Sequence, residues 1–174
     1  MNKPQVLAGP FVSNNGLICH VESDEPITGV IETFHPNGKV EERTTYKNGI
    51  KEGLRESFFA TGQLRIRGHC KADQQEGLVE GFYENGQPWW KVNWKAGKRN
   101  GRGETFNAAG QLVTREHYKD GRRDGPFEGF HEGGGLWVRG AFKADRQEGL
   151  WETFDPEGNP VAAETYQNGV IQEG

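Results

Sequence analysis

Hydrophobic and polar residues alternate along most of the chain in short runs, and turns containing glycine separate these runs. The run at residues 150–155 is followed by Pro-Glu-Gly at 156–158, and the run at 111–118 is followed by Lys-Asp-Gly at 119–121. Alternating runs at this spacing are typical of strands, and glycine supplies the positive φ angle of tight hairpins. No segment has the 3.6-residue apolar period of a helix, so the pattern predicts an all-β chain.

The same pattern recurs every 24 residues, in six rows that begin at residues 29, 53, 77, 101, 125 and 149. The fourth place is always Glu: Glu32, Glu56, Glu80, Glu104, Glu128 and Glu152. The sixth is always Phe: Phe34, Phe58, Phe82, Phe106, Phe130 and Phe154. The tenth is always Gly, and the eighteenth holds Tyr46, Cys70, Trp94, Tyr118, Phe142 and Tyr166. Strands are expected from the second to the seventh place and from the eleventh to the eighteenth.

A fixed period of this length indicates an elongated array of about six antiparallel β-hairpin repeats that form one twisted sheet. The repeats are residues 29–52, 53–76, 77–100, 101–124, 125–148 and 149–174. Residues 1–28 depart from the pattern. Phe11 and Gly16 there suggest a degenerate hairpin, so this segment is expected to be an N-terminal cap.

The shared columns are expected to be architectural. If the hairpin loop spans the eighth to eleventh places, the Glu column faces a basic column at the fifteenth place and the Phe faces the thirteenth. The basic column is Arg43, Arg67, Lys91, Arg115 and Arg139, and it predicts cross-strand pairs such as Glu56–Arg67 and Glu128–Arg139. A competing register, with one loop residue fewer, puts Phe opposite the twelfth place. The Phe column and the eighteenth-place aromatics are expected to form the core.

Function in a repeat protein is sought where the repeats differ, and the tryptophans are unevenly placed. Trp89 and Trp90 are adjacent on one strand, so they are expected to point to opposite faces, with at least one available to a partner. The predicted partner-binding residues are Trp89, Trp90, Trp137, Trp151, Arg65, Arg67, Arg139, Tyr83 and Phe127. No catalytic set, metal site or cofactor motif is evident, so we expect neither enzymatic activity nor a bound cofactor.

The net charge narrows the class of partner. The cysteines leave the cellular compartment undecided. The net charge of −4 and the pI of 5.8 disfavour a nucleic-acid partner. The sequence as given shows no long apolar run and no secretory signal, so a cytoplasmic location is expected; a periplasmic one stays open if a signal has been removed. Cys19 and Cys70 are read either as a disulfide or as two buried thiols.

Residues 149–158 and 46–49 resemble the MORN repeat in its bacterial variant form, and the resemblance extends over residues 29–174. It implies an antitoxin or immunity protein that binds a cognate toxin, in some cases a type VI secretion effector, and blocks its active site. MORN arrays elsewhere are usually scaffolds and have been linked to lipid binding.

Two alternatives to the toxin-binding interpretation follow from the sequence. A membrane-associated scaffold would use a lysine column at the nineteenth place, although the overall acidity disfavours it. That column is Lys47, Lys71, Lys95, Lys119 and Lys143. A structural homo-oligomer would form through an open strand edge at residues 161–174. The sequence does not decide between a monomer and a homodimer.

Overall fold

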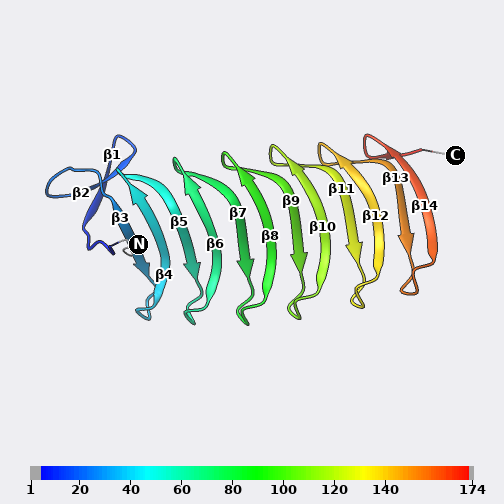
Figure 1. Ribbon diagram of the computed structural model, residues 1–174, viewed down its shortest axis with the longest axis horizontal. Helices are drawn as coiled ribbons and strands as arrows, with labels where there is room; N and C mark the ends of the chain where they lie inside the picture. Colours follow the sequence, from blue (N-terminus) through cyan, green and yellow to red (C-terminus); the bar gives the residue numbers. More distant parts are fainter. Residues whose placement is uncertain (1–4, 173–174) are drawn as a thin grey trace. The chain divides into compact units, whose positions relative to one another are not determined.

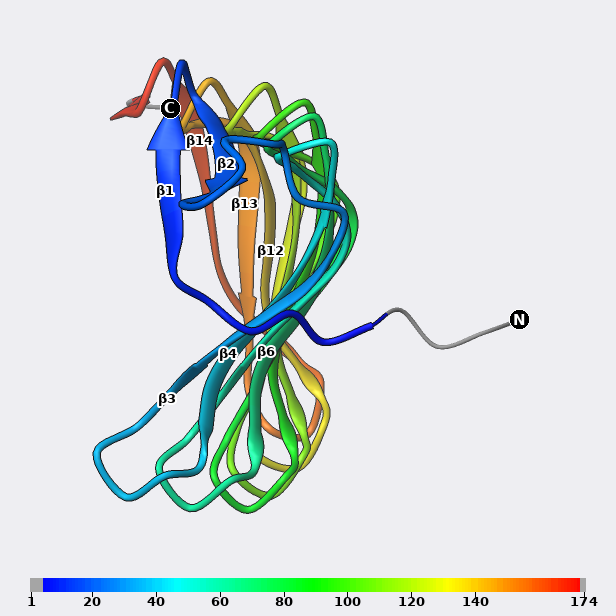
Figure 2. The ribbon, with the colours of Figure 1, turned by 90° about the vertical axis from the view of Figure 1, so that its left-hand side faces the viewer.

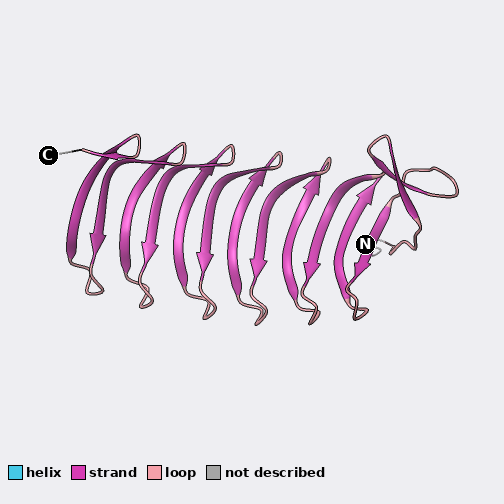
Figure 3. Cartoon of the chain, turned by 180° about the vertical axis from the view of Figure 1, so that it is seen from behind, coloured by secondary structure: helices cyan, strands magenta, loops and turns pink. Residues whose placement is uncertain are grey.

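The structure, a computed structural model, describes residues 5–172 as strands joined by short turns, with no helix among them (Figures 1 and 3). The chain divides into two compact units, Met1–Gly86 and Gln87–Gly174. The predicted all-β array of antiparallel hairpins is therefore confirmed.

The first unit contains β1 Phe11–Asn14, β2 Leu17–His20, β3 Gly29–Phe34, β4 Val40–Lys47, β5 Ile50–Phe58, β6 Leu64–Lys71 and β7 Gln74–Phe82. β1 and β2 pair with each other in a two-stranded sheet of their own. β3 to β7 lie side by side in chain order and form one antiparallel sheet.

The second unit contains β8 Pro88–Lys95, β9 Lys98–Phe106, β10 Leu112–Lys119, β11 Arg122–Phe130, β12 Leu136–Lys143, β13 Arg146–Phe154, β14 Pro160–Gln167 and β15 Val170–Ile171. These strands also follow one another in chain order. β9, β11 and β13 start 24 residues apart, as the sequence period requires. They begin earlier than predicted, at the twenty-second place of the preceding row, because the turn before each one has only two residues.

These two-residue turns have positive φ at both positions, the geometry of the tight hairpin whose twist matches that of the strands. Asn48 and Gly49 fit such a turn, with φ of 51° and 79°. The turn at Ala72 and Asp73 lacks glycine, and both residues still have positive φ. There the Asp73 carboxylate accepts a hydrogen bond of 2.8 Å from the backbone N–H of Lys51, which ties the turn to the preceding repeat.

A β-bulge near the other end of each hairpin sets the register. β3 and β4 pair Glu32 with Arg43 but Phe34 with Val40, so Glu41 is left out of the pairing. The same interruption occurs in β5–β6, β9–β10, β11–β12 and β13–β14. Each of the two registers considered from the sequence is therefore correct for one pair of repeat places. The fourth place faces the fifteenth, and the sixth faces the twelfth.

The core of this single-layered sheet depends on large side chains that lie over glycines of the neighbouring strand. Val79 is fully buried, and a Cβ added to Gly68 would come within 2.9 Å of its side chain. Trp151 is 8% exposed, and its indole covers Gly140. Glycine permits this approach because it has no side chain to displace the ring.

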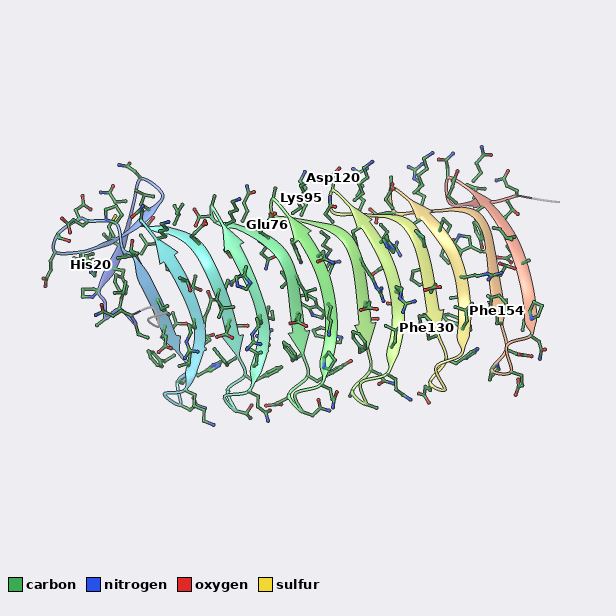
Figure 4. All side chains as sticks on the ribbon, viewed as in Figure 1. His20, Glu76, Lys95, Asp120, Phe130 and Phe154 are labelled. Carbon is green, nitrogen blue, oxygen red and sulfur yellow. The ribbon has the colours of Figure 1, made fainter. Side chains whose placement is uncertain are left out.

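The Phe column is not part of this core, contrary to the prediction. Phe34 is 56% exposed and the other five phenylalanines are half-buried, since they lie beside the hairpin turns of a one-layered sheet. Figure 4 shows Phe130 and Phe154 at equivalent points of successive hairpins. Each is covered by the fifteenth-place arginine of the preceding repeat, with Arg115 Cζ 5.6 Å and Arg139 Cζ 5.3 Å from the respective ring centroids.

The residues before β3 cover the outer edge of the first unit. Leu7 donates a backbone hydrogen bond to Val30, and Val30 donates one to Gln5. Figure 2 looks onto this edge and shows the segment before β1 crossing in front of the sheet, with the β1–β2 hairpin above β3. Cys19 of β2 and Ile27, which donates a backbone hydrogen bond to Ile18 of β2, are both buried. The hairpin suggested by Phe11 and Gly16 is thus present and bonds to Gly49 in the turn after β4, while the segment before it covers the open edge of β3.

The contact between Trp151 and Gly140 gives a direct test of the core. In Gly140→Ala, the new methyl group would overlap the indole, so we expect the free energy of unfolding to fall by about 1–3 kcal/mol in urea denaturation. Gly133→Ala is the control, because nothing lies within 4 Å of the added methyl; a change within about 0.5 kcal/mol is expected. Equal losses in the two variants would contradict this packing.

Candidate functional site

One face of the sheet carries alternating acidic and basic side chains from the fourth and fifteenth places, and we call it the ladder face. In the first unit, Arg43 Nε lies 2.7 Å from Glu32 and its Nη1 lies 3.4 Å from Glu56. Glu56 is buried and also accepts a hydrogen bond of 3.0 Å from Arg67, which confirms the predicted Glu56–Arg67 pair. Glu56 therefore joins two hairpins through two arginines.

The ladder face of the second unit also pairs fourth-place glutamates with fifteenth-place arginines. One of its pairs differs from the prediction. Arg115 lies 2.8 Å from Glu128 of the next repeat and 3.5 Å from Glu104 of its own. Glu128 and Arg139 oppose each other in register, as predicted, but the close ion pair of Arg139 is to Glu152, at 2.6 Å. Each of these arginines binds the following repeat most closely, so the ladder connects hairpins to one another.

The opposite face carries the third, fourteenth, sixteenth and eighteenth places, and we call it the aromatic face. In the second unit, four of its rings form one cluster around Trp151. The ring centroids of Phe127, Phe142 and Tyr166 lie 5.5, 5.0 and 6.3 Å from that of Trp151. Phe127 is stacked on the indole, and the other two rings meet it edge to face, the arrangements that aromatic pairs favour.

Two hollows on this face of the second unit are built from equivalent places, 48 residues apart. The first hollow has a volume of about 270 Å³ and is lined by residues that include Trp89, Trp90, Arg99, Thr105, Glu116 and Tyr118. The second hollow has a volume of about 370 Å³ and is lined by residues that include Trp137, Gln147, Trp151, Thr153, Glu164 and Tyr166. Each thus combines a thirteenth-place tryptophan with a Thr, a Glu and a Tyr.

A hydrogen-bonded Tyr–Glu pair lies in each hollow. The Tyr118 hydroxyl donates to Glu116 at 2.6 Å, and the Tyr166 hydroxyl donates to Glu164 at 2.7 Å. Burial, followed by the bond to Glu116, raises the pKa of Tyr118 to about 12. The bond to Glu164 also raises the pKa of Tyr166. Both hydroxyls therefore stay protonated at neutral pH and donate to the neighbouring glutamate.

The two exposed tryptophans of the predicted binding set border these hollows. Trp89 and Trp137 are each 51% exposed. Trp90 is half-buried and lines the same hollow as Trp89, so the expectation that the pair points to opposite faces is wrong. The bulge is the reason, as the equivalent pair shows: the ring of Trp137 and the side chain of Val138 both lie against Gly129.

Trp151 was expected to contact a partner, but it belongs mainly to the core, because only 8% of its surface is exposed. Phe127 is half-buried and stacked against it. The sequence did not show this because the glycine that makes room for the indole, Gly140, lies on the neighbouring strand.

The remaining predicted binding residues are not gathered with the tryptophans. Arg67 and Arg139 are engaged in the ladder, on the other face of the sheet. Arg65 is exposed in the first unit, with Cζ 5.9 Å from the ring centroid of Phe59. Tyr83 is half-buried in the same unit, and its carbonyl accepts a turn hydrogen bond from Gly86. The predicted set therefore divides between two faces and two units.

The Tyr–Glu pairs were not among the residues predicted to form the site. Glu116 with Tyr118 and Glu164 with Tyr166 repeat a Glu-x-Tyr spacing in the fourth and sixth rows. That spacing was visible, but only the hairpin register shows that it faces the tryptophans.

The two cysteines and His131 have structural roles in the fold. Cys19 and Cys70 are both buried free thiols, so the disulfide that the sequence left open is not formed. Burial raises the pKa of the Cys70 thiol. His131 Nε2 lies 2.9 Å from the carbonyl oxygen of Phe154 in the next repeat, to which it donates.

Within residues 5–172, no group of three or more His, Cys, Asp or Glu side chains is arranged to hold a metal ion. The same residues contain no helix that could cross a membrane.

The ladder predicts that removal of a negative charge lowers the free energy of unfolding by different amounts at different glutamates. Glu56→Gln leaves Arg43 and Arg67 without their shared carboxylate, so we expect the free energy of unfolding to fall by about 1–3 kcal/mol. Glu152→Gln, which affects only the exposed pair with Arg139, should cost less. Urea denaturation of both variants measures the difference, and losses of the same size would count against the ladder.

The raised pKa of Tyr118 predicts a separate ionisation step of this tyrosine at alkaline pH. The folded pKa of about 12 exceeds the ordinary value of 10.0, so the stability that Tyr118 contributes is complete below pH 10.0 and is lost as the pH rises through 12. In an ultraviolet absorbance titration, Tyr118 should be the last of the four tyrosines to ionise, and Tyr118→Phe should remove that last step. Ionisation of all four near pH 10.0 would contradict the buried Tyr118–Glu116 bond.

Comparison with known proteins identifies the repeat. Residues 27–48, 75–96 and 147–168 match the profile of the family described as "MORN repeat variant". No curated relative matches the chain. Solved structures of TarM are 13% and 14% identical, one of them an S. aureus mutant in complex with fondaparinux, alpha-GlcNAc-glycerol and UDP. Their TM-scores are 0.38 and 0.36.

The matched part covers 55% of this chain but only 19% and 20% of the TarM chains, so this likeness establishes neither a shared fold nor a shared activity. The matches to the family and the observed pairing of the hairpins both indicate the same kind of repeat. The chain is an all-β repeat protein that carries MORN-variant repeats at these three places.

Proposed function

We propose that the chain is a non-catalytic scaffold that binds a partner protein on the aromatic face of residues 87–174. The observation that carries this proposal is the pair of half-exposed tryptophans, Trp89 and Trp137, each at the border of a hollow. Tryptophans beside a desolvated pocket are typical binding hot spots. MORN repeats are generally protein- or lipid-binding scaffold repeats, which supports the same class of function.

The spacing of the two tryptophans suits a folded protein surface. Trp89 lies on β8 and Trp137 on β12, four strand steps apart within one sheet, which corresponds to about 19 Å. The ladder holds these strands in a fixed register, so little ordering is needed on binding, and that favours affinity. A partner that contacts both tryptophans would also cover the surface between the hollows.

We further propose that the partner is a toxin of the kind delivered by type VI secretion, which the chain neutralises by covering its active site. The resemblance to bacterial MORN-variant antitoxins supports this part of the proposal, and the aromatic face supplies the contacting surface. We place the complex in the cytosol, where the free thiols of Cys19 and Cys70 would stay reduced.

Two other functions each have one observation in their favour. The nineteenth-place lysines are exposed beside the two-residue turns and could contact anionic lipid. They alternate with acidic residues such as Asp73, Asp120 and Asp145, which weakens this reading. A homo-oligomer could form at β14, since β15 pairs with only two of its residues and Val161 is 67% exposed.

The partner-binding proposal predicts the effect of losing either tryptophan. With the protein encoded next to this chain as the candidate toxin, Trp89→Ala and Trp137→Ala should each weaken the complex by at least about 2 kcal/mol, or about thirtyfold in Kd. Val113→Ala is the matched comparison, since Val113 holds the same thirteenth place between the two tryptophans and is 38% exposed; loss of this smaller side chain should weaken the complex less than loss of either tryptophan. Calorimetry measures the affinities, and cell survival on co-expression reports neutralisation.

Unchanged affinity in both tryptophan variants would remove this face as the binding surface. Binding to phosphatidylserine vesicles at low salt, without binding to the candidate toxin, would favour the lipid scaffold. A stable dimer by light scattering, lost when β14 is altered, would favour the homo-oligomer.

A further inference from the structure

The twenty-third place of each repeat lies directly across a two-residue turn from the eighteenth. In the second unit these register pairs are Trp94 with Arg99, Tyr118 with Arg123, and Phe142 with Gln147. The twenty-third side chain therefore lies beside the slot between two consecutive eighteenth-place rings. Two of these three slots have an arginine of the chain itself, whereas the third has a neutral glutamine.

Arg99 shows how the slot of the first hollow is filled. Its Cζ lies 6.0 Å from the ring centroid of Trp94 and 5.3 Å from that of Tyr118. Its Nη1 donates to the Tyr118 hydroxyl at 3.2 Å, and that hydroxyl donates to Glu116. Stacking of the guanidinium on the rings and its proximity to a carboxylate both favour the cation there.

The second hollow has a related arrangement without the cation, and Trp151 stands where the first hollow has Gly103. Phe142 and Tyr166 form the slot, Trp151 forms its floor, and the Tyr166 hydroxyl donates to Glu164 as Tyr118 does to Glu116. Gln147 lines the hollow at the place equivalent to Arg99. Among residues 5–172, no arginine or lysine is stacked on Trp151 or Tyr166.

One arginine does approach this part of the sheet. Arg123 Cζ lies 3.9 Å from the ring centroid of Phe142, but Arg123 does not line the second hollow. Its Nε also lies 3.5 Å from Asp145, so its charge is already partnered. The second hollow is also the larger one, at about 370 Å³ against about 270 Å³. It therefore combines aromatic faces, a carboxylate and free volume.

We propose that the slot between Phe142 and Tyr166 receives an arginine side chain of the partner protein, in the position that Arg99 takes in the first hollow. The guanidinium would stack on the rings and approach the Glu164 side chain, which accepts the hydrogen bond of the Tyr166 hydroxyl. Arginine suits the slot better than lysine because its planar head stacks on aromatic faces and reaches a carboxylate with two donors. This inference relies on the proposed function only for the source of the arginine, a partner protein.

The test uses N-acetyl-arginine methylamide as the probe and the citrulline analogue, which has the same shape without the charge, as its control. NMR titration of the full chain should shift the Trp151 and Tyr166 signals with the arginine probe, with a millimolar Kd typical of so small a ligand. Citrulline should bind at least about tenfold more weakly. Equal binding of both compounds would overturn the proposal.

Exchange of the twenty-third-place residues makes the test specific to the slot. Gln147→Arg should fill the second hollow from within the chain and weaken probe binding at least about tenfold, whereas Gln147→Met, of similar length and neutral, should bind as the wild type does. Arg99→Gln should open the equivalent slot, so that the probe now shifts Tyr118 as well. Full binding to Gln147→Arg would refute the slot.

The remaining outcomes distinguish this inference from the proposed function. The probe needs no partner, so failure of the toxin assay leaves a positive probe result standing. A silent probe with an intact complex overturns the slot alone. Stronger binding of tetramethylammonium than of the arginine probe would overturn the guanidinium assignment and indicate a choline headgroup instead.

Discussion

Carboxylates and guanidinium groups alternate between neighbouring hairpins and join them, and much of the remaining structure depends on that alternation. Arg43 lies between Glu32 and Glu56, and Arg115 lies between Glu104 and Glu128, so each arginine spans two repeats. A shift of one residue would move these side chains to the other face and leave like charges or apolar groups opposed. The ladder therefore fixes the register of a sheet that has only one layer and a sparse apolar core.

A fixed register on the ladder face determines what the opposite face can present. Since successive residues alternate between faces, the third, sixteenth and eighteenth places must lie together on the aromatic face. The bulge adds the thirteenth place to them, which brings Trp137 next to Val138 over Gly129. The two hollows arise from this combination, and the places that line them vary from repeat to repeat. A stack built from constant columns thus supports a surface that can differ between proteins with the same repeat.

The period of 24 residues was enough to predict the strands, the turns and the pairing of Glu56 with Arg67, because these depend on contacts within one hairpin or between adjacent hairpins. The orientation of Trp90 was not predictable in the same way, since it depends on a bulge that alternation alone does not show. Trp151 was mistaken for a binding residue because its burial depends on Gly140 across the sheet. The Phe column was mistaken for core because a regular aromatic column resembles a buried stripe, whereas a single-layered sheet leaves it beside the turns.

The claim that the bulge turns the thirteenth-place tryptophans onto the aromatic face can be tested by one measurement. A nuclear Overhauser experiment in solution reports directly which protons lie beside the Trp137 indole. We expect cross-peaks from the indole to the Hα protons of Gly129 and to the methyl groups of Val138. Cross-peaks to Arg139 and Phe154 instead would place Trp137 on the ladder face and contradict both the hollows and the binding surface built on them.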